Sequence, residues 1–156
     1  MEIRIIAVGK LQKMYLEAEN EFLKRLTRYA KCTLIEVADS QAPEKLSPAQ
    51  KAAVQKEEWE RIEKKLSAND FFIALDSSGK QLLSENFAAK LKEWQGVKNP
   101  VFALGGSLGF CEEALKRADM RLSLSEMTFT HSMARVILLE QIYRGFKIMN
   151  REPYHK

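Results

Sequence analysis

The sequence predicts an α/β fold, with a mostly parallel sheet and helices on both faces. Short runs rich in β-branched and aromatic side chains alternate with segments whose apolar residues recur at three- and four-residue steps. One run, Asp70–Leu75, is continuously apolar, as expected of a strand that is buried on both faces. No internal repeat interrupts the series, and 156 residues fit one domain better than two. We therefore expect a single domain over residues 1–156.

Composition is that of a globular protein and sets only broad limits on function. The 25 Lys and Arg against 21 Asp and Glu give a net charge of +4, which is compatible with an anionic partner but too small to identify one. Cys32 and Cys111 stand alone, so two thiols in a reducing compartment are expected, with no disulfide and no metal site. The N-terminal apolar run, Ile3–Val8, is too short for a signal peptide or a membrane span. A cytoplasmic protein without a membrane partner is expected.

The first strand is predicted over residues 2–8, where β-branched side chains end at Gly9. An apolar stripe between Leu16 and Ala30 predicts the first helix. The opposite face of this helix is basic, and solvation is favoured over RNA contact as the reason. The basic residues are Lys24, Arg25, Arg28 and Lys31.

A second strand is predicted over Cys32–Ala38, followed by a polar segment from residue 39 to residue 46. Ser47 and Pro48 then form a helix start, because Ser accepts a hydrogen bond from a free N–H group and Pro at the first position loses no bonded donor. The helix is expected to reach about Leu66. Its narrow apolar seam consists of Ala52, Trp59, Ile62 and Leu66.

The second half begins with the strand Asp70–Leu75, which a turn at residues 76–79 is expected to close. Ser84 is predicted to cap the next helix. Further strands are expected at Val101–Leu104 and Met120–Ser125. The last helix, about residues 132–149, is apolar nearly all round and needs burial on more than one side, so we expect a homodimer through it.

Two loops of this half carry the residues that suit a ligand. Gly105–Gly109 follows one strand and Leu124–Phe129 follows the next, which places both at the carboxyl ends of neighbouring strands. The glycine spacing matches neither the dinucleotide fingerprint nor the phosphate loop, so a structural turn is favoured for the first loop alone. The second loop suits an uncharged ring such as adenine, or is a helix entry capped by Thr128 or Thr130. Residues 70–156 are thus the expected cofactor and catalytic half.

The last helix and the tail hold further candidates. Arg135 lies one turn after His131, while Arg144 follows Glu140 at the spacing of an ordinary intrahelical pair. The tail Tyr154-His155-Lys156 follows a stiffening proline and contains residue types that are unusual in a frayed end.

Taken together, these motifs resemble one family over essentially the full length of the chain. The chain is similar to the bacterial large-subunit ribosomal RNA pseudouridine N3-methyltransferases of the SPOUT class. Thr130 departs from the pattern, since many relatives have proline there, which would fix φ. The matching motifs are Val8-Gly9-Lys10, Ile73–Asp76, Gly105-Gly106-Ser-x-Gly109, Leu124-Ser-x-Met-Thr-Phe129, His131-x-x-x-Arg135, Leu139-Glu-Gln-x-Tyr-Arg144 and Tyr154-His-Lys156.

The resemblance implies a C-terminal trefoil knot, which periodicity does not indicate because threaded chains are rare. It also implies a homodimer that binds S-adenosylmethionine (SAM) in the knotted crevice at the subunit interface. The residues expected at the cofactor are Leu75, Gly105, Gly106, Leu124, Ser125, Glu126, Met127, Thr128 and Phe129.

The expected reaction is methylation of N3 of a pseudouridine in a loop of 23S ribosomal RNA, within the assembled large subunit or ribosome. The candidate catalytic residues are His155, Tyr154 and Arg135, and the candidate RNA-binding residues are Arg144 and Lys156. No metal is required. Two alternatives stay open: a non-catalytic RNA-binding or ribosome-assembly dimer, and a methyltransferase that acts on a transfer RNA base or ribose.

Overall fold

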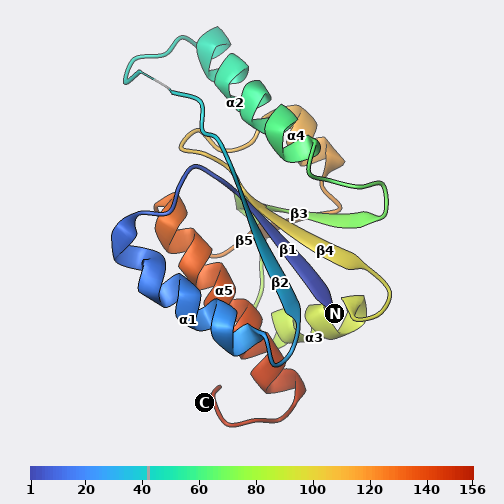
Figure 1. Cartoon of the computed structure of the whole chain (residues 1–156). Coiled ribbons are helices and arrows are strands. Elements are labelled where there is room, and N and C mark those ends of the chain that lie inside the picture. The colour runs from blue at the N-terminus through green and yellow to red at the C-terminus, as the bar shows by residue number, and fades with distance from the viewer. Residues whose placement is uncertain (42) are drawn as a thin grey trace.

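A computed structural model describes residues 1–41 and 43–156, and shows a five-stranded parallel sheet in the order β2-β1-β4-β3-β5 (Figure 1). Ala42, within the predicted polar segment 39–46, lies outside the described residues. The predicted α/β class with a mostly parallel sheet is confirmed. The strands are β1 (Glu2–Val8), β2 (Lys31–Val37), β3 (Asp70–Gln81), β4 (Asn99–Leu104) and β5 (Met120–Ser123).

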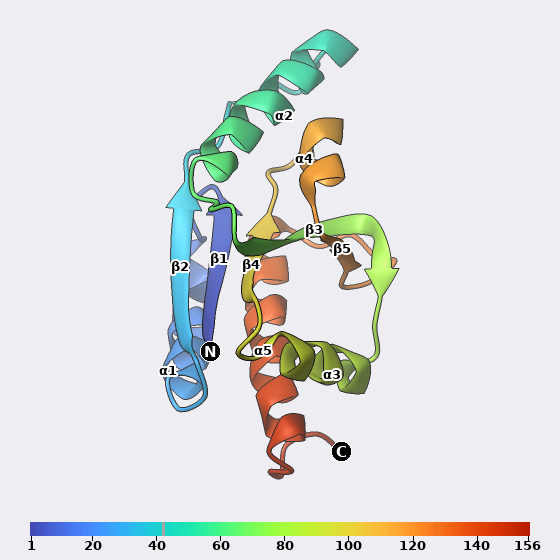
Figure 2. The same cartoon turned by 90° about the vertical axis from the view of Figure 1, so that its right-hand side faces the viewer.

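Helices cover both faces of the sheet, as predicted. On one face lie α1 (Leu16–Leu26), α3 (Ser84–Trp94) and α5 (His131–Met149), with α1 beside α5 (Figures 1 and 2). On the other lie α2 (Pro48–Glu63) and α4 (Glu112–Arg117). A short 3-10 helix, η1 (Lys13–Tyr15), follows β1. Within residues 1–41 and 43–156, no helix combines the length and apolarity needed to cross a membrane.

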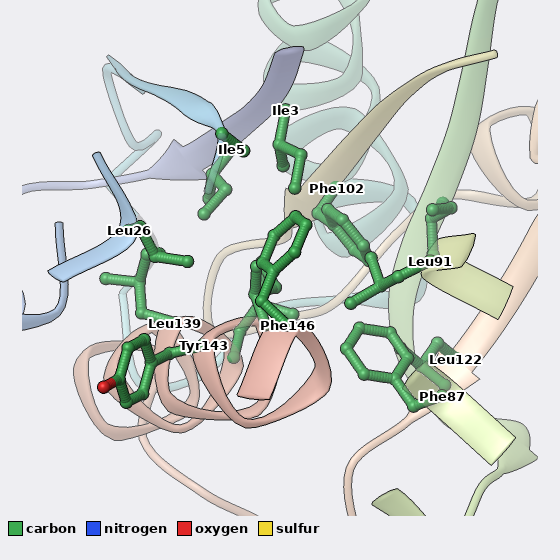
Figure 3. Packing of buried hydrophobic residues seen from close by; sticks show 14 of the residues in the cluster. Ile3, Ile5, Leu26, Phe87, Leu91, Phe102, Leu122, Leu139, Tyr143 and Phe146 are labelled. Atoms are coloured by element: carbon green, nitrogen blue, oxygen red, sulfur yellow. The ribbon is translucent and has the colours of Figure 1, made fainter. Parts of the chain in front are cut away.

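The two faces of the sheet bury two separate apolar clusters. On β1, Ile3 and Ile5 point toward α1 and α5, whereas Ile6 points toward α2, as the two-residue period of a strand requires. Figure 3 shows the larger cluster, which contains Phe146 of α5 and in which the ring centre of Phe102 on β4 lies 6.1 Å from that of Phe87 on α3. The sheet therefore forms the middle layer of a three-layer domain.

Helix α5 is buried along one side only. Leu138, Leu139, Ile142 and Phe146 are fully buried, but other apolar residues of the same helix remain partly exposed. A single protomer therefore leaves part of this apolar helix uncovered. The partly exposed apolar residues are Met133, Val136, Ile137, Ile148 and Met149.

Two of the predicted helix caps are present. Ser47 Oγ accepts from the Gln50 N–H at 3.2 Å, and Gln50 Oε1 accepts from the Ser47 N–H at 2.8 Å, which completes a capping box. Thr130 Oγ1 accepts from the Met133 N–H at 3.3 Å and caps α5.

The predicted turn at residues 76–79 is wrong. Strand β3 continues to Gln81, and its pairing with β5 shifts register between Leu75 and Lys80. Residues 76–79 have no pairing partner among the described residues of β5 and form an irregular stretch of β3, and pairing with β5 resumes at Lys80 and Gln81.

Three further boundaries differ from prediction. Ser84 is not the cap of α3, because Leu83 takes that position, and Ser84 Oγ instead donates to Gln141 Oε1 at 2.8 Å. Helix α1 ends at Leu26, so Arg28 lies in the following turn and Lys31 begins β2, away from the helical face predicted for them. Strand β5 ends at Ser123, which leaves Leu124 and Ser125 in the loop.

Candidate cofactor and active site

The register of three strands brings the predicted cofactor residues to one edge of the sheet. Leu75 of β3 pairs with Leu104 of β4 on one side and with Leu122 of β5 on the other. Neighbouring strands lie about 4.8 Å apart. Gly105 begins the loop just after Leu104, and Leu124 lies two residues beyond Leu122. The loops after β4 and β5 therefore flank Leu75 at the carboxyl ends of the strands.

The glycine loop after β4 is a compact turn. The Gly109 N–H donates to the Gly106 carbonyl at 3.0 Å, and Gly109 has a φ of 71° that favours glycine. A Cβ placed on Gly105 would lie 3.2 Å from the Gly109 carbonyl carbon. Because glycine has no side chain, a ligand can approach the backbone of this loop closely.

Helix α2, outside the predicted catalytic half, holds the glycine loop from the opposite face of the sheet. Gln55 Nε2 donates to the Leu108 carbonyl at 2.7 Å and to the Phe110 carbonyl at 3.3 Å. One turn later, Glu58 packs against Gly106, where a Cβ would come within 2.6 Å of its Oε2. Gly106 thus faces Glu58, and any larger side chain there would require the Glu58 carboxyl group to shift.

Glu58 is a buried carboxyl group, with 4% of its surface exposed. Its Oε1 accepts from the Ser40 N–H at 3.0 Å, whereas its Oε2 has no partner among the described residues. Burial raises the pKa of Glu58, and the Ser40 hydrogen bond and the charge of Arg61 oppose this only in part.

The loop from Leu124 to Thr130 is held mainly by short-range bonds. Ser123 Oγ donates to the Ser125 carbonyl at 2.9 Å, and Ser125 Oγ accepts from the Met127 N–H at 3.0 Å. Met127 is 75% exposed and Phe129 is 37% exposed. The loop therefore presents apolar side chains and hydroxyls to a ligand without covering them.

A cavity of about 40 Å³ lies between this loop, α3 and α5. Its wall combines apolar side chains with the Ser123 hydroxyl and the Gln141 amide. A pocket for a drug-sized ligand measures about 300–1,000 Å³. One protomer thus forms only part of such a site. The lining residues are Leu82, Phe87, Leu122, Ser123, Leu124, Leu138 and Gln141.

Arg135, a predicted catalytic residue, is buried in the first turns of α5 with 3% of its surface exposed. Its Nε and NH2 donate to the two carboxylate oxygens of Glu19 on α1, the second at 2.9 Å. Its NH1 donates to Glu36 Oε1 on β2 at 2.8 Å. Every nitrogen of the guanidinium group therefore contacts a carboxylate within the protomer.

The tail folds back onto the middle of α5. Tyr154 OH donates to Glu140 Oε1 at 3.0 Å, and the Arg144 guanidinium carbon lies 4.7 Å from the centre of the Tyr154 ring. His155 Nε2 lies 2.9 Å from Glu85 Oε1 at the start of α3. The predicted pair of Arg144 with Glu140 is present. Tyr154, His155 and Arg144 are thus neighbours.

The tail of one protomer lies away from the Thr130 end of the cofactor loop, whereas Leu124, at the beginning of the loop, lines the same cavity as Gln141. Glu140 lies ten residues after Thr130, so the Tyr154 hydroxyl sits about 15 Å along α5 from the end of the loop. Burial and the hydrogen bond to Glu140 raise the pKa of Tyr154, although Arg144 opposes this. Tyr154 therefore stays protonated at neutral pH and acts as a donor.

Sequence reasoning missed Glu19, Glu36, Gln55 and Glu58. Two of them carried a usable signal, since Glu19 lies on the apolar stripe of the first helix and Gln55 lies on the seam of α2. A charged residue within an apolar stripe, together with an arginine on an apolar helix, predicts a buried ion pair. In residues 1–41 and 43–156 no cluster of His, Cys, Asp or Glu suits a metal ion.

Comparison with known proteins agrees with this geometry. A curated relative from Carboxydothermus hydrogenoformans, named ribosomal RNA large subunit methyltransferase H, is 52% identical with full coverage of both chains. A protein of the same name from Enterococcus faecalis is 45% identical, again over both full lengths. A solved structure, described as a probable methylase family protein from Haemophilus influenzae, shares the fold with a TM-score of 0.57 at 14% identity. That likeness covers 99% of this chain and 70% of the other.

A family model described as predicted SPOUT methyltransferase matches residues 1–155. The match spans the sheet, the glycine loop, the loop after β5 and nearly the whole tail. The chain therefore belongs to the SPOUT methyltransferase family.

Proposed function

We propose that this protein uses SAM to methylate N3 of a pseudouridine in a loop of 23S ribosomal RNA. The curated relatives are named as large-subunit ribosomal RNA methyltransferases. The observation that carries the proposal is the strand register around Leu75, which brings Gly105 and Leu124 to one sheet edge. That edge is where open α/β sheets bind ligands.

The residues at this edge fit the cofactor. An adenine ring needs apolar walls and backbone hydrogen-bonding groups, and Leu75, the glycine loop and the loop from Leu124 to Phe129 supply both. SAM would provide the methyl group. Gly105 and Gly106 would allow close approach of the backbone, while Met127 and Phe129 would cover the ring.

The tail is proposed to handle the acceptor base. N3 loses its proton on methylation, and the imidazole of His155 is suited to take it. Tyr154, as a protonated donor, would orient the base, and Arg144 with Lys156 would contact RNA phosphates. Arg135 supports the site from within the protomer, because its guanidinium group is already occupied.

We infer a homodimer that completes each site. In one protomer the cavity between the loop after β5, α3 and α5 measures only about 40 Å³, part of α5 is uncovered, and the tail lies on α5 ten residues after Thr130. A second copy packed against α5 in the opposite direction would bring its tail to the loop. The trefoil knot stays a prediction that follows from the family.

The RNA partner is proposed to be the assembled large subunit or the ribosome. A net charge of +4 supports few phosphate contacts, so shape recognition by folded RNA is needed for tight binding. A looped-out base is required because N3 is inaccessible in a duplex. A ribosomal substrate implies a cytoplasmic location.

The test is methyl transfer from labelled SAM to large ribosomal subunits that lack the modification, followed by mass mapping of the labelled nucleoside. Label in pseudouridine of 23S RNA is the expected result, with a saturable rise in melting temperature on adding SAM. If parallel reactions with unmodified transfer RNA became labelled and the ribosomal subunits did not, the acceptor would be transfer RNA. No transfer and no SAM-induced stabilisation would favour an RNA-binding module.

A further inference from the structure

We propose that the buried pair of Arg135 and Glu19, extended by the exposed Glu36, forms an ion cluster that positions the cofactor loop from Leu124 to Thr130. The inference rests on the proposed function for its cofactor readout. It makes Arg135 a positioning residue, and adds two glutamates from the N-terminal part of the chain to the machinery of the site.

The loop from Leu124 to Thr130 has few restraints of its own. Its side-chain hydrogen bonds at Ser125 and Thr130 are short-range, and most of its side chains are exposed. Its path is therefore set at its ends, by β5 and by the first turns of α5. Whatever fixes the beginning of α5 fixes the loop.

The beginning of α5 is fixed by polar contacts. Ser132 is fully buried, and its Oγ accepts from the Gln12 N–H at 3.3 Å. Arg135, one turn later, joins α5 to α1 and to β2 through Glu19 and Glu36. Glu36 Oε1 also accepts from the Leu11 N–H at 3.2 Å. Helix α1, strand β2 and the segment after β1 thus all meet the first turns of α5.

Charged residues, rather than apolar ones, hold the beginning of α5. A buried ion pair costs desolvation, and apolar residues of similar volume often stabilise a protein as much. An ion cluster, unlike apolar packing, is directional. A planar guanidinium that makes two parallel hydrogen bonds fixes both the rotation of the helix about its axis and its position along that axis. At this site the exact position of α5 matters more than its contribution to stability, because the cofactor loop leads directly into this helix.

Glu36 shows that the cluster is electrostatically coupled. Burial alone would raise the pKa of Glu36, but the hydrogen bonds from Arg135 and from the Leu11 N–H outweigh it and lower the pKa. Lys10 adds a further positive charge nearby. The carboxylate is therefore ionised at neutral pH and available to Arg135.

The experiment compares wild type with Glu19→Gln, which keeps the side-chain volume and weakens the cluster without altering any predicted cofactor residue. Glu21→Gln is the matched control, because Glu21 lies on the same helix in an exposed pair with Arg25. The readouts are hydrogen exchange of the amides of residues 124–130 without cofactor, and the Kd for SAM by calorimetry.

For Glu19→Gln we expect faster exchange in residues 124–130 and a SAM Kd raised about tenfold, as for loss of one hydrogen bond to a charged group. Arg135→Lys should act in the same way, and the two changes together should be less than additive because they share the cluster. Glu21→Gln should match wild type in both readouts.

Unchanged loop exchange in Glu19→Gln and Glu36→Gln would overturn the inference. So would loss of activity in Arg135→Lys when both glutamine variants bind SAM normally, because Arg135 would then act directly on substrate. Failure of wild type to bind SAM would instead count against the proposed function, and loop exchange would still decide whether the cluster positions residues 124–130.

Discussion

Glu58 is a buried carboxyl group, and the burial of its charge lowers the stability of the folded protein at neutral pH. Its Oε2 is buried without a partner among the described residues, beside Gly106. The raised pKa means that the folded state holds the proton more tightly than the unfolded state. Stability therefore falls as pH rises from the ordinary glutamate pKa to that of folded Glu58, and the penalty persists above it.

We expect Glu58→Gln to stabilise the protein at neutral pH by about 1 kcal/mol, because the neutral amide removes the cost of burying a charge. The gain should shrink as pH falls below the raised pKa of folded Glu58, and should be lost below the ordinary glutamate pKa. Urea unfolding at several pH values measures it. Glu57→Gln is the control, since Glu57 is exposed beside it, and an equal gain there would contradict the explanation.

His155 carries the proposed proton transfer. His155→Ala should lower kcat about a hundredfold or more, which is the usual contribution of a general base, and should leave the Kd for SAM unchanged. Unaltered turnover would exclude His155 as the base, while Glu85→Gln controls for loss of its contact with α3.

At the scale of elements, the irregular half of β3 is the feature that departs most from expectation. Gly79 lies against β5, where a Cβ would be 2.7 Å from the carbonyl carbon of Arg121. Backbone atoms in a paired strand cannot move aside as a side chain can. The close approach of these strands requires glycine.

Gly79→Ala should therefore weaken the pairing of β3 with β5 and destabilise the fold by about 1–3 kcal/mol, the usual range for overpacking. Denaturant unfolding gives the free energy. Ser78→Ala, an exposed neighbour on the same strand, should change stability by less than about 0.5 kcal/mol. A Gly79→Ala protein as stable as wild type would show that the strands separate without cost.

Elements whose signal is local were predictable from sequence. The β-branched run of β1, the Ser47 cap and the choice of Thr128 or Thr130 as a cap depend on a few neighbouring residues, and the structure has the strand, the Ser47 cap and the Thr130 cap. The extension of β3 was not predictable, because residues 76–79 have turn propensity and the strand continues beyond them only through the pairing of Lys80 and Gln81 with β5. Tertiary pairing decided that segment.

Some residues of the candidate site were likewise predictable from sequence, and others were not. Motif resemblance indicated Leu75, Gly105 and Leu124, and the register places them together. The supporting side chains of Glu58 and Gln55 come from α2 on the other face of the sheet, so their role depends on which helix covers which strand. Sequence spacing within the second half does not contain that information.

At the scale of the whole molecule, the separation of tail and loop predicts how two subunits share a site. Tyr154 contacts Glu140, about 15 Å along α5 from Thr130. If the partner's tail serves each loop, a subunit with a damaged loop and a subunit with a damaged tail complement each other. One of the two sites in such a heterodimer then combines an intact loop with an intact tail.

We therefore expect that a Gly106→Val variant and a His155→Ala variant, each inactive alone, recover activity when unfolded and refolded together. Random pairing makes half of the dimers mixed with one good site each, so about a quarter of wild-type activity should return. If loop and tail of the same subunit formed the site, mixing would restore nothing, because every site would keep one defect. Methyl transfer to large ribosomal subunits measures the recovery, and mixing either variant with itself is the control.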